Sequence, residues 1–420
     1  MSWQKEVDEI GKRKKLAEAM GGPEKLKKQK ADGKLNARER IAGLVDKGSF
    51  REIGQLGGAA TYDAKGDLKS FLPSNMLFGR AKIEGRPVVV QSDDFTVRGG
   101  AADAAIHEKL VQSEKLAGEY RMPLVRMIEG TGGGGSVKTL ETMGFTYVPE
   151  VPGWDLMVDN LSLIPVVALG LGPVAGLGAG RLVMSHYSLL VKGLSQLFVA
   201  GPPVVAAVGE KRTKEELGGS HIHAKNGAID DEAASEAEAF AMARTFLSYL
   251  PSSIHELPER KPTRDKPDRR EQFLIEAVPR DLRHLYKIRP IIEAVVDQGS
   301  FFEIGRQHGP SIVTGFARID GYPVGIMASD PMVLGGLWTA ATARKVERFI
   351  DLADTFHLPV VHMVDNPGFE NKTTPRGCHD RRHPDPRPRA AAPARPFVGG
   401  PAQPPPRGRG VRARHRHPLQ

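Results

Sequence analysis

Short apolar runs alternate with amphipathic segments along most of this chain. Residues 86–92, 122–128 and 163–169 are apolar runs flanked by turn residues, a pattern that is typical of buried strands. Between the first two runs, residues 99–121 carry apolar side chains at helical spacing and predict a helix. Strands that alternate with helices predict an α/β domain with helical crossovers.

Two glycine-rich stretches follow predicted strands. The first, Gly130–Gly135, comes after the second strand and precedes a predicted helix over residues 136–143, which Ser136 can cap. The second, residues 170–180, comes after the third strand and is predicted to be a loop. A short strand is predicted for residues 195–200.

The chain contains a long internal repeat. Residues Gly79–Pro87 return as Gly315–Pro323, at an offset of 236 residues (315 minus 79). The same offset pairs Asp94 with Asp330, Gly99-Gly100 with Gly335-Gly336, Lys109 with Lys345, Pro123 with Pro359, Glu129 with Asp365 and Gly132 with Gly368. A repeat of this length predicts two homologous domains rather than a short-period solenoid.

Changes in composition suggest where these domains begin and end. We predict a polar helical segment at 1–48, a first domain at 49–251, a linker rich in proline and charge at 252–285, an incomplete second domain at 286–369 and a disordered Arg/Pro-rich tail at 370–420. Within the first segment, Lys25 to Lys34 is predicted to be a solvated basic face. The second copy is predicted to contain strands at 323–328 and 359–364 around a helix at 337–356.

The basic charge belongs to the tail. The whole chain has a formal charge of +9, but residues 371–420 hold 12 Lys or Arg and 2 Asp, which leaves the rest at −1. A nucleic-acid partner is therefore not expected for the body. For the tail, RNA binding by a disordered segment competes with a shifted reading frame, which we favour because the repeat stops within a motif. By the repeat offset, an intact second copy is expected to reach about residue 466 (230 plus 236).

Cysteine content and hydropathy bear on location. The single cysteine, Cys378, leaves no disulfide framework, and the first 20 residues contain no apolar signal region, so we predict a cytoplasmic protein. Residues 161–180 are the nearest approach to a membrane span, but glycines and prolines interrupt them. No membrane association is predicted.

The glycine stretches allow three uses. Gly130, Gly132 and Gly135 match a phosphate-binding G-x-G-x-x-G pattern, but the acidic strand end that a dinucleotide domain needs is missing. A second use is structural, as tight turns that let a helix pack on a sheet. A third is an oxyanion hole, in which backbone N–H groups stabilise an enolate or thioester oxygen. Two such stretches in a repeated domain favour the third use.

The polar side chains suggest less chemistry. No Ser/His/Asp arrangement is recognisable, and His221 and His223 lack the cysteine or carboxylate neighbours of a metal site, so no metal is predicted. Packing roles are expected for His186-Tyr187, and a solvated helix face for Glu215-Glu216. The lack of an evident general base suits chemistry in which a cofactor supplies the base and the protein supplies oriented amides.

Four stretches resemble one family. They are Asn36-Ala37-Arg38-Glu39-Arg40-Ile41, Asp94-Phe95-Thr96-Val97 followed by Gly99-Gly100, Glu215-Glu216-Leu217-Gly218-Gly219, and Val364-Asp365-Asn366-Pro367-Gly368-Phe369. Together they are similar to the carboxyltransferase (β) subunit of biotin-dependent acyl-CoA carboxylases, which include the propionyl-CoA, acetyl-CoA and methylcrotonyl-CoA enzymes. The resemblance covers about residues 30 to 369 and implies an α/β fold of two tandem ClpP/crotonase-like domains, the second incomplete.

The resemblance also implies a reaction and partners. A carboxyl group moves from carboxybiotin, held on a separate biotin carboxylase/biotin carrier (α) subunit or domain, to the α-carbon of an acyl-CoA. Members form homo-oligomers, from dimers to hexamers, with each site between the N-domain of one protomer and the C-domain of its partner. Such a duplicated fold offers one pair of backbone donors to each of two oxyanions, on the thioester and on the biotin ureido group.

Carried over by position, the resemblance implies specific site residues. The thioester oxyanion hole falls at Gly176 and Leu177, with Gly132 and Gly133 lining the same pocket. Further substrate-binding candidates are Gly134, Gly135, Gly178, Gly99, Gly100 and Arg80. The family reads Ser-Gly-Gly-Ala-Arg where this chain has Thr131–Gly135, and Ala-Gly-Gly-Ala where it has Ala175–Gly178. Both departures affect the choice of substrate.

The sequence thus predicts an acyl-CoA carboxyltransferase subunit whose activity is impaired by its altered end. Two alternatives remain open. One is a crotonase-type acyl-CoA hydratase or isomerase, which needs an acid/base pair near Gly133 and Gly176. The other is a non-enzymatic scaffold or RNA-binding protein that acts through the basic tail.

Overall fold

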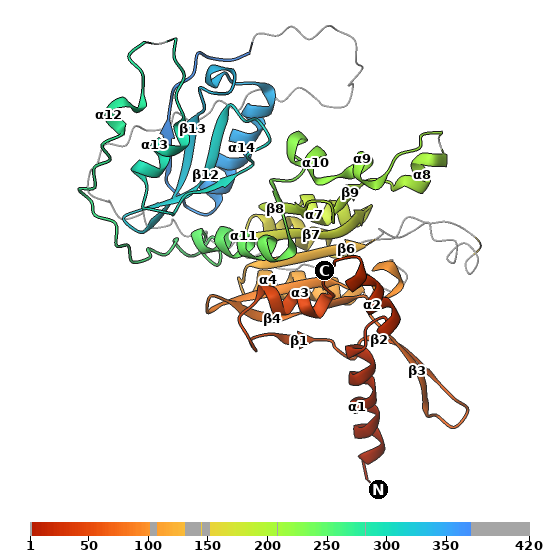
Figure 1. The fold of residues 1–420 in the computed structure, drawn as a ribbon. Coiled ribbons are helices and arrows are strands. Elements are labelled where there is room, and N and C mark those ends of the chain that lie inside the picture. Colours follow the sequence, from red (N-terminus) through yellow and green to blue (C-terminus); the bar gives the residue numbers. More distant parts are fainter. Residues whose placement is uncertain are drawn as a thin grey trace, which may run out of the picture. The chain divides into compact units, whose positions relative to one another are not determined.

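The computed structural model describes residues 2–100, 107–130, 144, 152–207, 209–281 and 283–370. These residues form an eight-stranded sheet, a four-stranded sheet and a two-stranded hairpin, with helices around them (Figure 1). The predictions for Gly132, Gly133, Gly134 and Gly135, for the helix at 136–143 and for residues 371–420 lie outside the described residues.

The eight-stranded sheet contains the first copy of the repeat. Its order is β1 (Arg51–Ile53), β4 (Met76–Ile83), β5 (Arg86–Asp93), β6 (Leu124–Gly130), β7 (Val166–Ala175), β8 (Tyr187–Val191) and β10 (Asp231–Ala233), with β9 (Gln196–Phe198) also paired to β7. The β1, β4 and β5 strands are antiparallel, whereas β5, β6, β7, β8 and β10 run parallel. The hairpin joins β2 (Gly58–Tyr62) to β3 (Leu68–Pro73).

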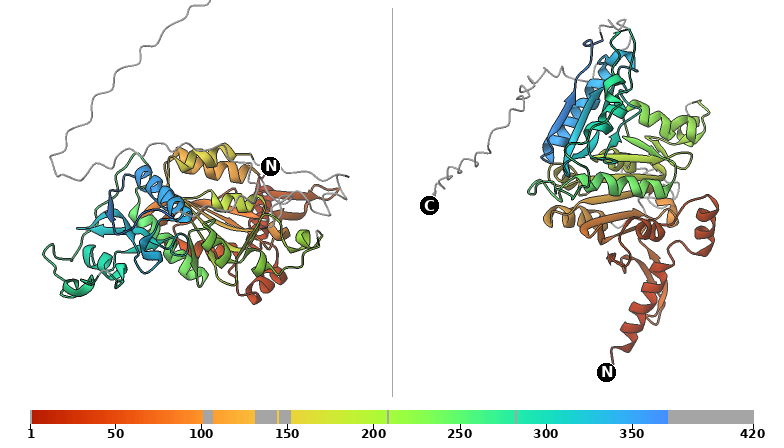
Figure 2. Two further views of the ribbon diagram at one scale, coloured as in Figure 1. Left: turned by 90° about the horizontal axis from the view of Figure 1, so that it is seen from above. Right: turned by 60° about the vertical axis from the view of Figure 1, so that its left-hand side comes forward.

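Helices cover both faces of this sheet, which explains why most residues of its parallel strands are buried (Figure 2). The helices of this part are α1 (Gln4–Glu18), α2 (Pro23–Ala31), α3 (Ala37–Leu44), α4 (His107–Glu119), α6 (Trp154–Leu161), α7 (Leu177–Val183), α8 (Pro202–Ala207), α9 (Lys214–Gly218), α10 (Ser220–Asn226) and α11 (Glu236–Tyr249). Leu124 packs in a cluster with α4, and Val125 packs in the main core with α3 and α11. This alternation follows from the two-residue period of a strand.

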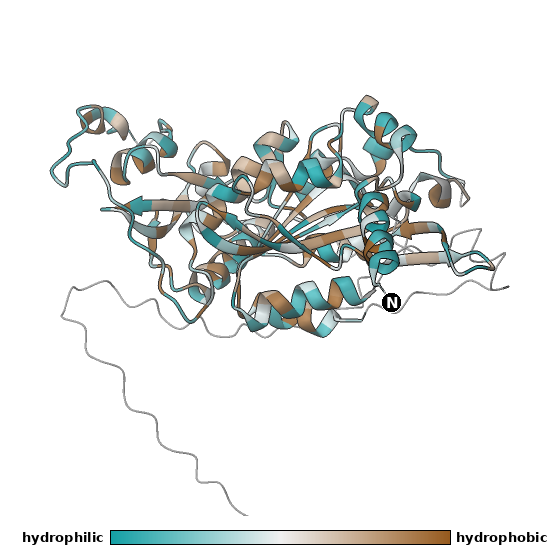
Figure 3. Cartoon of the chain, turned by 90° about the horizontal axis from the view of Figure 1, so that it is seen from below, coloured by the Kyte–Doolittle hydropathy of each residue, from teal (hydrophilic) through white to brown (hydrophobic). Residues whose placement is uncertain are grey.

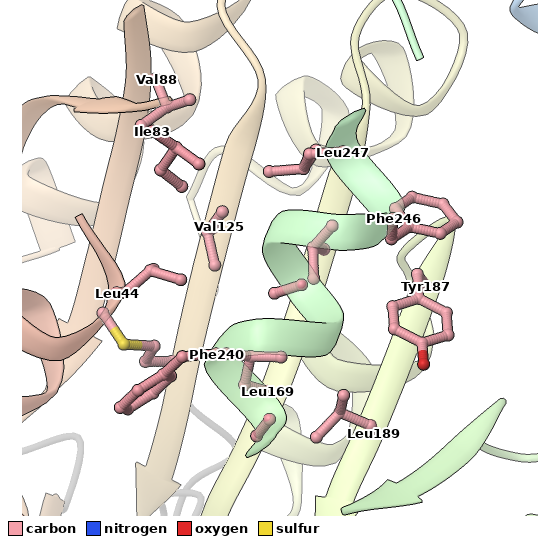
Figure 4. Close-up of a cluster of buried hydrophobic side chains, with 14 of the residues drawn as sticks. Leu44, Ile83, Val88, Val125, Leu169, Tyr187, Leu189, Phe240, Phe246 and Leu247 are labelled. Carbon is pink, nitrogen blue, oxygen red and sulfur yellow. The ribbon is translucent and has the colours of Figure 1, made fainter. Parts of the chain in front are cut away.

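The main core lies between the strands and the helices α3 and α11. Figure 4 shows Leu44 of α3 and Phe240 of α11 beside Val125 and Leu169 on the central strands. The covering helices carry hydrophobic residues on one side and hydrophilic residues on the other, as their coloured ribbons indicate (Figure 3).

The second copy forms the four-stranded sheet β11 (Phe302–Ile304), β12 (Ile312–Ile319), β13 (Tyr322–Ser329) and β14 (Val360–Met363), in that order. Its helices are α12 (Leu274–Ala277), α13 (Ile288–Val295) and α14 (Ala340–Thr355). The 3-10 turn η1 (Arg98–Gly100) of the first copy matches η3 (Leu334–Gly336) of the second. The pairing of β1, β4, β5 and β6 is therefore repeated in β11, β12, β13 and β14, and the predicted duplication of one α/β fold is confirmed.

The duplication extends to individual side-chain bonds. The Lys109 ammonium donates to the Met76 carbonyl at 3.0 Å, and the Lys345 ammonium donates to the Ile312 carbonyl at 2.7 Å. The ion pair Arg38–Glu52 is repeated as Arg289–Glu303. Asp46 accepts from the amides of Glu84 and Gly85, and Asp297 accepts in the same way from the amides of Asp320 and Gly321. Asp94 accepts from the Thr96 amide, and Asp330 accepts from the Met332 amide. These bonds belong to the shared framework rather than to one site.

Two local predictions are wrong. Residues 170–180 are not one loop, because β7 continues to Ala175 and α7 begins at Leu177. The glycines in this strand serve packing: a Cβ on Gly170 would lie 2.4 Å from the Leu190 side chain, and one on Gly172 would lie 2.4 Å from the Glu129 carboxylate. In the N-terminal segment, Lys34 is not solvated, since its ammonium pairs with the buried Glu129.

The expected secondary structure is otherwise largely found. The strands at 86–92, 122–128, 195–200, 323–328 and 359–364 appear with small shifts, and the helix at 337–356 appears as α14. The helix at 99–121 is shorter than predicted, because η1 occupies its start. The domain boundaries stay a prediction. Among the described residues, no helix combines the length and the apolar composition that a membrane crossing requires.

Candidate functional site

The turn between β7 and α7 contains the predicted oxyanion residues. Gly176 has φ 57° and ψ −123°, a conformation that residues with a side chain rarely adopt. Its N–H donates to the Phe198 carbonyl at 3.2 Å, so it is already engaged. Among the described residues, the N–H groups of Leu177 and Gly178 have no acceptor, as expected for the first turn of a helix. Gly176 therefore shapes the turn, and Leu177 and Gly178 present its backbone donors.

Two arginines fix the helix that follows this turn. The fully buried Arg126 donates to the carbonyl of Met184 at 2.7 Å and pairs with the equally buried Glu114, which satisfies the C-terminal end of α7. Arg181, within α7, pairs with Asp93 at the end of β5 at 3.1 Å. Both contacts anchor the last turn of this seven-residue helix, and they thereby fix the direction in which the amides at its start point.

The carboxylate of Asp93 lies at the carboxyl ends of the strands. Burial raises the pKa of Asp93, and the charge of Arg181 opposes that rise. The next residue, Asp94, also has its pKa raised by burial, while hydrogen bonds from Thr96 lower it. Asp93 accepts from Arg181 through both oxygens, and Asp94 accepts from Thr96 through Oδ1, so both carboxyls have a structural role at this strand end.

Gly99 and Gly100 lie beside the end of β6. Gly100 has φ 68°, and a Cβ there would lie 2.8 Å from both the Glu129 carbonyl oxygen and the Gly130 Cα. This close approach explains why glycine occupies the position. The structure therefore brings Gly100 to the strand end from which the first glycine stretch departs, next to β7, whose Val174 pairs with Gly130.

A buried charge network supports the same strand end. The carboxylate of Glu129 is fully buried and accepts bonds from Arg40 at 2.6 Å and from Lys34 at 2.5 Å. Arg40 also pairs with Glu236 at 2.7 Å and donates to the Leu171 carbonyl of β7 at 2.6 Å. The network ties α3 and α11 to β6 and β7 directly beneath the candidate site.

Two of the four motifs that suggested the family meet at this network. Arg40 comes from the motif at 36–41, and Phe95, from the motif at 94–97, lies under the Lys34 ammonium at 4.8 Å. Roles for Arg40, Glu129 and Lys34 were not predicted from the sequence. One signal was available, because Arg40 falls on the apolar face of α3 next to Ile41, where a lone arginine requires a buried partner.

Arg80 lies elsewhere. It stands opposite Val89 on β5, which in turn pairs with Leu124 at the start of β6. Its side chain is exposed in a groove that Lys47, Arg51 and Lys82 also line. The structure thus places Arg80 at the amino ends of the parallel strands, whereas the turn at Gly176 lies at their carboxyl ends.

The remaining candidates have structural contacts. The rings of His223 and His186 bond the carbonyls of Leu197 and Leu161, and burial lowers the pKa of His186 to about 4. Glu216 caps α9 by accepting from Thr213. Within the described residues, no group of three His, Cys, Asp or Glu side chains could hold a metal ion.

Comparison with known proteins supports an assignment for the whole fold. Residues 28–374 match the model of the carboxyl transferase domain. The propionyl-CoA carboxylase beta chain of Roseobacter denitrificans is 31% identical over 365 residues, which cover 86% of this chain and 71% of that protein. The methylmalonyl-CoA decarboxylase subunit alpha of Veillonella parvula is 32% identical over 372 residues, with coverage of 87% and 71%.

Solved structures agree with these relatives. The hexameric transcarboxylase 12S with methylmalonyl-coenzyme A bound superposes with a TM-score of 0.78 at 29% identity, covering 89% of this chain and 72% of that one. A single-chain, multi-domain long-chain acyl-CoA carboxylase gives a TM-score of 0.73 at 27% identity, with coverage of 88% and 37%. The strand order and the repeated turns described above therefore belong to a fold that carries acyl-CoA chemistry in other proteins.

Proposed function

Because the chain belongs to the carboxyl transferase domain family, we propose that it moves a carboxyl group between biotin and the α-carbon of an acyl-CoA. The turn at the start of α7 is the observation that carries this proposal. Leu177 and Gly178 present two adjacent backbone N–H groups without acceptors among the described residues. Two aligned donors suit an oxygen that gains negative charge during the reaction.

The thioester oxygen is the group that these donors would hold. Removal of a proton from the α-carbon places negative charge on that oxygen, and donors that are already oriented stabilise the charge without reorganising. The rigid support from Arg126 and Arg181 keeps the donors in place before substrate arrives. Gly132 and Gly133 would line the same pocket, since their stretch leaves β6 next to β7.

Carboxybiotin, when delivered by a partner protein, supplies the carboxyl group and, once that group has left, a basic nitrogen for the α-proton. This division suits the site, because the nearby described carboxylates Glu129 and Asp93 are both held in ion pairs. The turn that the resemblance assigns to biotin would follow residue 369, so no residue of the described part is assigned to biotin.

Partners and assembly are part of the proposal. The expected partner is a biotin carboxylase/biotin carrier (α) subunit, and the expected assembly is a homo-oligomer with sites shared between protomers. The hexamer of transcarboxylase 12S supports the second point. A cytoplasmic location is also proposed, since one cysteine in 420 residues excludes a disulfide framework.

The acyl group is proposed only as a class. The relatives are named for propionyl-CoA and methylmalonyl-CoA, and they match this chain equally well although one is a carboxylase and the other a decarboxylase. Both reactions share the step that exchanges a carboxyl group with an acyl-CoA, and the proposal concerns that step. We infer a short-chain acyl-CoA or its carboxylated product as substrate.

The test combines binding with transfer. Calorimetric titration of the full chain with propionyl-CoA is expected to show binding that coenzyme A alone shows more weakly. Carboxyl transfer from methylmalonyl-CoA to free biotin is then measured by loss of the labelled carboxyl group. If no acyl-CoA binds and no transfer occurs, the proposal fails. Hydration of crotonyl-CoA without biotin would favour the hydratase alternative instead.

A further inference from the structure

A cavity of about 180 Å³ lies between elements of the two copies, away from the turn at Gly176. The first copy contributes the start of β8 and the segment after α10, through His186 and Asp230, and the second contributes β11, β12 and α14. Its floor is apolar and includes Ile304, Phe349 and Leu352. An apolar cavity of about 150 Å³ can hold benzene, so this one has room for about six non-hydrogen atoms.

The first copy shows how this space arises. Phe78 of β4 corresponds to Thr314 of β12 at the repeat offset of 236 (314 minus 78). A Cβ on Gly54 would meet both Lys109, at 3.3 Å, and the Phe78 ring, at 4.0 Å. At the equivalent Gly305, only the Lys345 side chain lies within 4 Å, at 3.5 Å. The Phe78 ring therefore fills a space in the first copy that stays open beside Thr314 in the second.

The cavity carries an excess of positive charge. Its lining includes three cations, Arg344, Lys345 and Arg348, and one carboxylate, Asp230. Asp230 pairs with Arg348 at 2.8 Å, which leaves Arg344 and Lys345. The carboxylates Glu303 and Asp231, which do not line the cavity, act on Lys345 and partly offset the effect of burial on its pKa. An ion of opposite charge is favoured where a site has such an excess at an apolar wall.

The two remaining cations differ in their contacts. The Lys345 ammonium donates to the Ile312 carbonyl at 2.7 Å, and burial lowers its pKa to about 8. Arg344 is exposed at the opening, and its guanidinium has no hydrogen bond or ion pair with any described residue. Its fork of N–H donors can therefore take a carboxylate in two parallel bonds.

We propose that this cavity is a second ligand site, which binds a small organic monocarboxylate with an aliphatic body. The carboxylate lies at Arg344, and the aliphatic body occupies the space that Phe78 fills in the first copy. His186 offers no competing charge, since both of its ring nitrogens bond to backbone groups and its pKa of about 4 keeps it neutral at pH 7. Such a ligand would contact both copies and stabilise their junction.

Sodium butyrate is the probe for this site, and 1-butanol is its uncharged control. Ligand-observed NMR on the full chain is expected to show saturable butyrate binding with a Kd of about 1 mM, as suits about six non-hydrogen atoms. Butanol is expected to bind about tenfold more weakly. Equal binding of the two probes, or no butyrate binding at 20-fold this Kd, would overturn the proposal.

Two substitutions locate the ligand. Thr314→Phe gives the second copy the aromatic ring that Phe78 provides in the first, and it is expected to fill the cavity and abolish butyrate binding. Arg344→Gln is expected to weaken it about tenfold, whereas Arg280→Gln, which changes an exposed arginine outside the cavity, leaves it unchanged. Unaltered binding in Arg344→Gln rejects the carboxylate position, and unaltered binding in Thr314→Phe rejects the cavity. If Thr314→Phe does not fold, the comparison of Arg344→Gln with Arg280→Gln still tests whether butyrate binds at Arg344.

Discussion

The two copies of the repeat share a skeleton but differ in what surrounds it. Each has a lysine that donates to the first strand of its hairpin and an aspartate that accepts two amides of the hairpin turn. Among the described residues, only the first copy surrounds its central carboxylate completely: Glu129 is fully buried between two cations, whereas the equivalent Asp365 is exposed within that part of the chain and accepts from Tyr286.

This difference separates framework from function. Bonds that occur in both copies hold the hairpin and its helix together, and they carry no information on chemistry. Among the described residues, a feature found only in the first copy, such as the Glu129 network, points to a role that the fold alone does not require. The position equivalent to Leu177 is residue 413 (177 plus 236), which lies outside the described residues. The described part of the second copy thus serves as an internal control for the first.

The largest effect is expected from Arg40→Met. This change removes the cation between Glu129 and Glu236 in the dry interior of the first copy, and an uncompensated buried charge costs about 3–5 kcal/mol in the free energy of unfolding. Arg289→Met in the second copy breaks partly exposed ion pairs and is expected to cost about 1 kcal/mol. Urea denaturation measures both. Arg289 is the counterpart of Arg38 rather than of Arg40, so equal losses would mean that the buried network contributes no more to stability than the partly exposed pairs that both copies have.

The next effect concerns catalysis rather than stability. Leu177→Pro removes one backbone donor at the first position of α7, where a helix tolerates proline, and is expected to lower carboxyl transfer by about 100- to 1000-fold. Leu177→Ala keeps the N–H and serves as the matched control, with a much smaller loss. Transfer to free biotin and thermal unfolding are measured together. Similar rates for the two variants at similar stability would exclude Leu177 as a donor.

A reciprocal exchange sharpens the comparison of the hairpins. Phe78→Thr opens in the first copy the space that the second copy already has, and we expect a loss of about 2–4 kcal/mol because the cavity is not refilled. Thr314→Phe places a ring where space exists and is expected to cost less than about 1 kcal/mol. Denaturation of both variants checks the pair. A larger loss for Thr314→Phe would show that the two copies differ in backbone as well as in side chains.

A smaller effect depends on pH and involves the junction of the copies. Burial raises the pKa of Asp231 from 3.8 to about 7, and its carboxylate accepts from the amides of Gly305 and Arg306 in the second copy. Between pH 4 and 7 the folded state therefore binds more protons than the unfolded state, so this contribution to stability falls as the pH rises. We expect a change on the order of 1 kcal/mol after relaxation.

Asp231→Asn tests this contribution. Urea denaturation at several pH values is expected to give a flatter profile between pH 4 and 7 for the variant than for the original chain. Lys345 titrates in another window: its pKa of about 8 lies below the ordinary 10.5, so its contribution to stability rises between about pH 8 and 10.5 and does not interfere. An unchanged slope in Asp231→Asn would show that Asp231 is ionised in the folded protein throughout this range.

The smallest difference is expected for the shared framework. Asp46→Ala and Asp297→Ala each remove two bonds to the hairpin amides, and each should cost about 1 kcal/mol. Hydrogen exchange of the two hairpins, followed separately, measures the local effect. Unequal losses would show that these bonds are not equivalent, and would weaken their use as an internal control.

Several features of the fold could be predicted from the sequence. An apolar run such as 86–92 indicates a strand that is buried on both faces. The run can be recognised without knowing which segments cover the strand. The repeat is likewise visible in the sequence, because both copies keep glycine at Gly100 and Gly336, where a side chain would strike the backbone. The motifs around Arg38 and Asp94 suggested the family because they, too, are short runs of residues that can be recognised in the sequence.

The amino-acid sequence by itself therefore determined the duplication, the α/β class and the family, since each is recorded in residue types at short spacing. Only the tertiary structure decided that Glu129 pairs with Arg40, that Phe198 engages the Gly176 amide and that Thr314 leaves a cavity. The physical reason is that these are pairings between segments that lie far apart in the chain. Local pattern reports that a position is buried, and the fold alone reports what it is buried against.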